Sequence, residues 1–427
     1  MLSRYLKILR DRKFSLLWLG QIVSQFGDRL TQIALVGLVS KASMSSSSLA
    51  FTMSMAIIPV FLISPISGIY IDRWSKRKTM YISDFMRGIF LLLIPFFFLK
   101  LNSLMPIYFL IFLSFSAGRF FIPSKMAFIP QVVKKPDIFI ANSLISITAT
   151  IAAILGFGLG GIIVEFFGIT SAFILDAATF FISGIFIFLI PVREKGDFIP
   201  TDILDIGKEV VDNVKKSFLR ELKEGVHYIC NSHETKYAFK IFFFLFSYIG
   251  GLYVVFIRFI QGVLSSVTSD LGFVVVFLGG GIFFGSLLYG RIAHKFAIRK
   301  IINFAVLLAS LYLIFFVLTL RAHPFSLYAF FHAFVLGILI SPAFIGINAL
   351  IHKESDESLL GRIFSGLELI SHLGFLVSMF LASFLADIFN TFTIIVAIGI
   401  IGSIFSLFFI LTDREHGSNR GTQAPPA

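Results

Sequence analysis

Three ionisable residues lie deep inside long apolar stretches of this sequence, where a charge is costly. Asp28 follows Phe14 by 14 positions, which puts it about 21 Å along a helix and near the centre of a roughly 30 Å hydrocarbon core. The same count places Glu368 about 14 Å deep and Arg119 at about mid-depth. Charges at such depths usually face a cavity, a partner or a substrate. These residues could therefore bind protons or a charged ligand without covalent chemistry.

Asp28 has the sharpest functional interpretation of the three. Burial favours its neutral form and a nearby cation favours its ionised form, so an acid held between the two can act as a proton switch. The neighbouring Arg29 points about 100° away around the helix and is a poor direct partner. The alternative is a neutral or arginine-paired carboxyl that fixes helix packing. Glu368 has a similar alternative, as a packing residue beside His372.

Other charges in the apolar stretches have plainer interpretations. Lys125 and Arg258 lie toward the ends of their segments and are expected to extend into the lipid headgroups. Asp176 and Glu165 lie nearer the outer surface, and we expect mainly structural roles for them.

The elements that position these residues are predicted to be membrane-spanning helices. Hydrophobic residues make up 57% of the chain, above the roughly 45–50% of soluble domains. Each apolar segment is long enough to cross a core that needs about 20 helical residues. We predict an all-α integral membrane fold with twelve spans, at 14–39, 49–71, 79–100, 104–131, 139–165, 168–191, 239–262, 270–295, 299–320, 325–352, 359–386 and 391–412.

The net charge of +12 is explained by membrane orientation better than by nucleic acid binding. With the amino terminus in the cytoplasm, about 28 of the 36 Lys and Arg fall in the tails and even-numbered loops, as the positive-inside rule requires. We therefore place both termini in the cytoplasm. Cys230 is the single cysteine, so no intramolecular disulfide is possible. We expect neither a metal nor an organic cofactor.

Two short basic segments 222 positions apart indicate an internal duplication. Residues 68–78 read GIYIDRWSKRK and residues 290–300 read GRIAHKFAIRK, and each lies between two apolar segments. The polar stretch 192–238 divides the chain at the corresponding place, and its helical periodicity predicts an amphipathic helix on the membrane surface. The predicted organisation is a six-helix half at 1–191, a cytoplasmic linker at 192–238, a pseudo-symmetric second half at 239–414 and a disordered tail at 415–427.

The first basic segment resembles the loop motif of the major facilitator superfamily. Its matching residues are Gly68, Asp72, Arg73, Lys76, Arg77 and Lys78. The resemblance implies a cytoplasmic gate in which Asp72 contacts the amino-terminal end of the eleventh span, near 359–361. The second copy has His294 at the position of Asp72, so the two gates are expected to differ.

Two further features resemble motifs of drug exporters within that superfamily. Arg119 is similar to the arginine of the fourth-span motif of drug/proton antiporters, although Phe120 follows it in place of the usual Gln-Gly. The small residues Gly156, Gly158, Gly160 and Gly161 resemble the fifth-span antiporter motif, with Phe157 where proline is usual. Close helix packing alone would also explain this glycine run.

Phrases across the chain resemble the macrolide-efflux and enterobactin-exporter branch of the superfamily. They include Ser83-Asp84-Phe85-Met86-Arg87-Gly88 and Ala141-Asn142-Ser143. The resemblance implies a secondary transporter and not an enzyme, one that exports a bulky amphipathic drug or siderophore in exchange for protons by alternating access.

We expect protons, the small amphipathic substrate and membrane lipids as partners, no nucleic acid, and a monomer as the sufficient unit. The alternative function is a lysophospholipid transporter or flippase, which the phrase Gln25-Phe26-Gly27-Asp28 also resembles. A membrane receptor or scaffold is the third class, but it would not need several near-central charges.

Overall fold

The apolar segments form long helices in the computed structural model. It describes residues 2–64, 66–67, 70, 74–101, 103–192, 233–264, 266, 268–292, 297–354 and 360–419. Every regular element in these ranges is helical: α1 (Leu2–Leu9), α2 (Arg12–Ala42), α3 (Ser46–Leu62), α5 (Lys76–Leu101), α6 (Met105–Val132), η1 (Lys135–Asp137), α7 (Ile138–Phe167), α8 (Ile169–Phe188), α10 (His233–Val263), α11 (Ser269–Ile292), α12 (Ile298–Ala322), α13 (Ser326–Glu354), α14 (Leu360–Phe389) and α15 (Thr391–Asn419).

Ten of the described helices are long and apolar enough to cross a membrane. α2 is not among them because it carries Gln21, Gln25, Asp28, Arg29 and Gln32 in its middle, and the described part of α3 has 17 residues. The predicted all-helical membrane fold is confirmed, while the count of twelve spans stays a prediction.

Exposed apolar stripes show which helix faces are suited to lipid. On α15, Ile400, Ile404, Leu407 and Leu411 recur every three or four residues and are all exposed. On a water-soluble protein such stripes would be aggregation sites, whereas hydrocarbon chains solvate them without cost.

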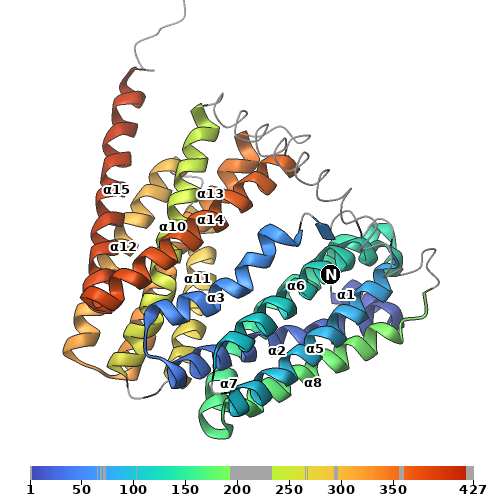
Figure 1. Ribbon diagram of the computed structural model, residues 1–427. Coiled ribbons are helices and arrows are strands. Elements are labelled where there is room, and N and C mark those ends of the chain that lie inside the picture. The colour runs from blue at the N-terminus through green and yellow to red at the C-terminus, as the bar shows by residue number, and fades with distance from the viewer. Residues whose placement is uncertain are drawn as a thin grey trace, which may run out of the picture. The chain divides into compact units, whose positions relative to one another are not determined.

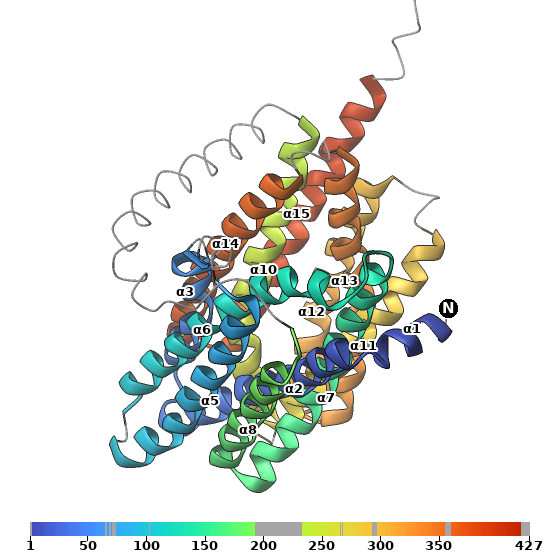
Figure 2. The same ribbon diagram turned by 90° about the vertical axis from the view of Figure 1, so that its right-hand side faces the viewer.

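The chain forms two compact units that use the same packing scheme. The first contains residues 1–222 with 266–272, and the second contains 223–265 with 273–427. In the first unit α2 packs on α7, and α5 packs on both α6 and α8; in the second, α10 packs on α14, and α12 packs on both α13 and α15. Figures 1 and 2 show α5, α6 and α8 side by side in both views. Corresponding helices therefore have corresponding neighbours.

The predicted linker and tail are described only at their edges. The amphipathic linker helix predicted around 206–229 and the repeat residue His294 lie outside the described residues. α15 continues to Asn419, so the described part of the segment after 414 is helical where the sequence analysis predicts disorder.

Glycines bring α7 against α2. A methyl group at Gly156 would lie 2.7 Å from Arg29 Cβ and 2.9 Å from the Phe26 carbonyl oxygen, and one at Gly160 would lie 3.2 Å from Leu30 Cδ2. Such distances leave no room for a side chain at Gly156. Gly158 is also buried. The close approach fixes the position of the α2 segment that carries Asp28.

The second half of the glycine run packs on the segment that begins α11. A methyl group at Gly161 would lie 2.5 Å from the Thr268 carbonyl oxygen, and the Thr268 hydroxyl donates to the Gly161 carbonyl at 3.1 Å. Residues 266–272 belong to the first unit. The glycine run thus has a packing role on two sides, and its predicted role in antiport stays a prediction.

We predict that Gly156→Ala lowers the thermal unfolding temperature of the purified protein. The added methyl overpacks the α2–α7 contact, which costs about 1–3 kcal/mol. Gly279→Ala is the matched control, since no atom lies within 4 Å of a methyl at that helical glycine. Alanine there should be neutral or stabilising by up to about 1 kcal/mol through helix propensity. Equal effects of the two substitutions would contradict the packing argument.

Candidate functional site

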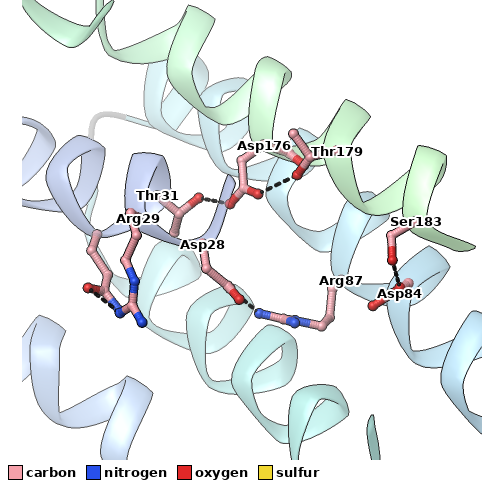
Figure 3. Close-up of polar contacts among 9 residues, drawn as sticks. Asp28, Arg29, Thr31, Asp84, Arg87, Asp176, Thr179 and Ser183 are labelled. Atoms are coloured by element: carbon pink, nitrogen blue, oxygen red, sulfur yellow. Dashed lines mark hydrogen bonds and ion pairs between the residues drawn. The ribbon is translucent and has the colours of Figure 1, made fainter. Parts of the chain in front are cut away.

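Asp28 forms an ion pair with an arginine from another helix. The Arg87 guanidinium, on α5, donates through Nη2 to Asp28 Oδ1, on α2, as Figure 3 shows. Arg87 is 11% exposed at its side chain and Asp28 is 30% exposed. The pair joins two helices near the middle of the first unit, and its acid is the more accessible member.

Arg87 is held on several sides besides its acid. Its Cζ lies 3.9 Å from the centre of the Phe180 ring on α8, which is a cation–π contact. A methyl at Gly118 on α6 would lie 3.6 Å from the same Cζ, an ordinary contact distance. The guanidinium therefore contacts α2, α6 and α8, and its flat shape suits this narrow space.

A second carboxylate and a second cation extend the polar cluster. Asp84 is fully buried on α5 and accepts a hydrogen bond from the Ser183 hydroxyl of α8 at 2.6 Å. Lys125 Nζ, on α6, donates to Gln21 Oε1 at 3.0 Å and interacts electrostatically with Asp28 and Asp84. Lys125 thus turns into the bundle, and the expectation that it extends into the headgroups is wrong. The gain from two nearby carboxylates explains why.

Asp176 completes the cluster from α8. It is 0% exposed and accepts a hydrogen bond from the Thr31 hydroxyl, and its Oδ1 lies 3.0 Å from the Thr179 hydroxyl oxygen. It also interacts electrostatically with Asp28 and Arg87. Figure 3 shows the three acids and Arg87 on neighbouring helices. We call Asp28, Asp84, Arg87, Lys125 and Asp176 the charged cluster.

The remaining predicted residues are described in part or lie outside the described part of the chain. Arg119 is half-buried on α6, and its predicted role stays a prediction. Arg29 contacts Gln32, with Nη1 and Oε1 3.3 Å apart, and the ring of Phe157, which agrees with its predicted orientation away from Asp28. The side chain of Glu368 lies outside the described residues.

In the basic loop, Gly68, Asp72 and Arg73 lie outside the described residues. Lys76, Arg77 and Lys78 form the first turn of α5, where the helix dipole disfavours cations. Arg77 Nη1 donates to the Ile190 carbonyl oxygen at 2.5 Å, beyond the end of α8. Arg77 therefore ties together the two helices that carry Arg87 and Asp176. The predicted gate stays a prediction.

In the second unit, Arg258 is also buried where we expected it to extend into the headgroups. It is 4% exposed on α10, donates to Gln261 Oε1 at 3.1 Å and interacts electrostatically with Asp387 of α14. Glu165 accepts a hydrogen bond from the Ser269 backbone amide at 3.1 Å, which fits its predicted structural role.

Sequence reasoning missed Arg87 as the partner of Asp28. Asp84 and Arg87 are three residues apart, a spacing that suggests a pair within one helix. Instead each finds a partner on another helix. Arg87 is about 17 Å from the start of α5, so the depth criterion that selected Asp28 would also have selected it.

The sequence model of the Major Facilitator Superfamily matches residues 17–331 and 241–427. Among characterised and uncharacterised relatives, the chain is 25% identical over 366 residues to the uncharacterized MFS-type transporter YkuC of Bacillus subtilis (strain 168), covering 84% of this chain and 82% of the relative. It is 24% identical over 414 residues to the multi-drug resistance efflux pump PmrA of Streptococcus pneumoniae serotype 4 (strain ATCC BAA-334 / TIGR4), covering 93% and 95%.

Solved structures show the same fold. A bacterial homologue of the iron transporter ferroportin, in an inward-facing state, superposes with a TM-score of 0.74 at 12% sequence identity and covers 93% of this chain and 98% of that one. The nucleoside transporter NupG superposes with a TM-score of 0.71 at 12% identity and covers 93% and 98%. At these identities the likeness concerns the fold alone.

We predict that Arg87→Gln lowers the folded yield and the unfolding temperature, because it leaves Asp28 without its cation in a mostly apolar interior. Adding Asp28→Asn to that variant should restore part of the loss, with a coupling on the order of 1 kcal/mol or more. Fluorescence-detected size-exclusion chromatography, before and after heating, measures the folded yield and the unfolding temperature. Arg29→Gln is the control, since Arg29 contacts an amide and a ring and should show no coupling to Asp28. Additive effects of Arg87→Gln and Asp28→Asn would contradict the pairing.

Proposed function

Because this chain belongs to the Major Facilitator Superfamily of transporters, we propose that it is a proton-coupled exporter of bulky amphipathic small molecules. The observation that carries the proposal is the interhelical Asp28–Arg87 pair, in which Asp28 is the more exposed member. The likeness to the efflux pump PmrA over 414 residues supports the direction and the substrate class.

The pair supports a mechanism of exchange at one carboxylate. When Asp28 is ionised, it is stabilised by Arg87 and can also attract a cationic or hydrogen-bond-donating group of a substrate. When Asp28 takes up a proton, that attraction is lost, so the proton and the substrate compete for the same group. Protons entering down their gradient would then drive substrate out by alternating access, with Glu368 and Arg119 assisting.

The setting we infer is a bacterial plasma membrane with both termini in the cytoplasm. The positive-inside distribution of Lys and Arg supports this orientation, and the bacterial relatives support the membrane. One chain suffices for this mechanism, and its partners are the substrate, protons and surrounding lipids. Transport of this kind needs no covalent step, so we propose no enzymatic activity.

Proton movement in proteoliposomes tests the proposal. A pH-sensitive dye reports proton flux when lipophilic cations, siderophores or lysophospholipids are added to vesicles containing the wild-type protein. We expect at least one amphipathic compound to drive proton movement, and Asp28→Asn to reduce it to the level of protein-free vesicles.

Two controls show whether a lost proton signal reflects Asp28 itself, and whether the protein is an exporter or a lysophospholipid flippase. Arg29→Gln changes an adjacent charge that does not contact Asp28 and should retain the proton signal. An unchanged flux in Asp28→Asn would refute the role of Asp28. Lysophospholipid movement without a proton signal would favour the flippase instead.

A further inference from the structure

The hydrogen bonds around Asp176 leave one oxygen without a donor of its own. The Thr179 hydroxyl lies 2.7 Å from the Asp176 backbone carbonyl oxygen and 3.0 Å from Asp176 Oδ1. A hydroxyl has one hydrogen to donate. The shorter contact is the usual bond from a threonine to a carbonyl of the preceding turn, so that hydrogen goes to the backbone. Thr179 Oγ1 can then only accept from Oδ1.

The second oxygen of Asp176 has a clear donor. The Thr31 hydroxyl of α2 donates to Oδ2. Oδ2 thus receives a hydrogen bond, while Oδ1 faces an acceptor. This is the pattern of a neutral carboxylic acid with its proton on Oδ1. An ionised carboxylate would instead place the lone pairs of Oδ1 against those of Thr179 Oγ1.

The surrounding charges favour the same state. The elements packed against α8 are α2, α5 and α7. From α2, Asp28 repels an ionised Asp176; from α5, Arg87 attracts it but is already bonded to Asp28. The charged residue of α7, Glu165, is bonded to the Ser269 amide instead. Within the described residues, no Lys or Arg forms an ion pair with Asp176.

The α2 backbone seals this position from water. A methyl at Gly27 would lie 2.1 Å from both Asp176 Oδ1 and Thr179 Oγ1, so the glycine backbone lies directly on the pair. Asp176 is accordingly 0% exposed. A fully buried carboxylate without a bonded cation is costly when ionised, whereas a hydrogen-bonded neutral acid is not.

We propose that Asp176 is a proton-binding site, which holds a proton on Oδ1 in this conformation, where Oδ1–H donates a hydrogen bond to Thr179 Oγ1. The site is separate from the Asp28–Arg87 pair but lies beside it. Movement of α2 away from α8 would remove both Thr31 and the Gly27 backbone, admit water and allow the proton to leave. Its part in coupling rests on the proposed export function, while the proton binding itself does not.

Infrared spectroscopy of the purified protein at neutral pH tests the assignment directly. A protonated carboxylic acid has a carbonyl stretching band that an ionised carboxylate lacks. We expect the spectrum of the wild type minus that of Asp176→Asn to contain this band. Asp84→Asn is the matched control, since Asp84 is equally buried on a neighbouring helix, and it should leave the band in place. No band in the difference spectrum, or its loss in Asp84→Asn alone, would overturn the proposal.

A second variant keeps the test decisive if Asp176→Asn fails to fold. Thr31→Val keeps the carboxyl and removes the donor to Oδ2, so the band should remain but move to higher frequency, because its carbonyl oxygen loses a hydrogen bond. An unmoved band would overturn the assignment to Asp176.

Measurements of substrate and proton flux distinguish the proton site at Asp176 from the proposed export function. If both hold, Asp176→Asn should still exchange substrate across vesicles but release one proton fewer for each substrate bound. The infrared band together with an absence of any coupled proton flux in the wild type would support the proton site and refute the exporter mechanism.

Discussion

The cost of placing charge in an apolar interior determines the arrangement of the first unit. An isolated ion there would cost several kcal/mol, so each charge must find a partner or become neutral. Asp28 and Arg87 solve this by pairing, Lys125 by turning toward two acids and Gln21, and Asp176 by hydrogen bonds to two threonines. Each solution joins two different helices. The charged cluster therefore holds α2, α5, α6 and α8 together.

Glycine and small polar residues make these contacts possible. Gly27 allows the α2 backbone to lie on Asp176, and Gly156 allows α7 to approach α2 next to Arg29. A side chain at either position would push the two helices apart and weaken these contacts. In lipid, where apolar residues gain nothing by leaving the solvent, such close packing and hydrogen bonding replace the hydrophobic effect between helices. The glycines therefore allow the close helix contacts within which the charged cluster forms.

The sequence predicted the helix positions well but could not predict helix rotation. Long apolar segments and loop charges gave the all-helical membrane fold, and depth along the first span selected Asp28. Depth does not say which neighbour a side chain faces, so Lys125 was expected in the headgroups and Asp176 was assigned a minor role. Arg87 entered the sequence analysis only as part of a phrase shared with exporters, and nothing in that phrase indicates its contact with α2. The partners of Asp84 and Arg87 depend on which helices lie next to α5. No local pattern in the sequence contains that information.

The geometry of α2 links the ion pair to the proposed proton site. Asp28 and Thr31 are three residues apart and so lie on the same face of the helix. Asp28 contacts Arg87 of α5, while Thr31 donates to Asp176 of α8. A movement of α2 that changes its distance to both α5 and α8 would therefore act on both contacts. Binding a substrate at Asp28 would weaken its hold on Arg87, freeing that guanidinium to attract Asp176 in its ionised form. Under the proposed mechanism, charge exchange at Asp28 would thereby favour release of the proton from Asp176.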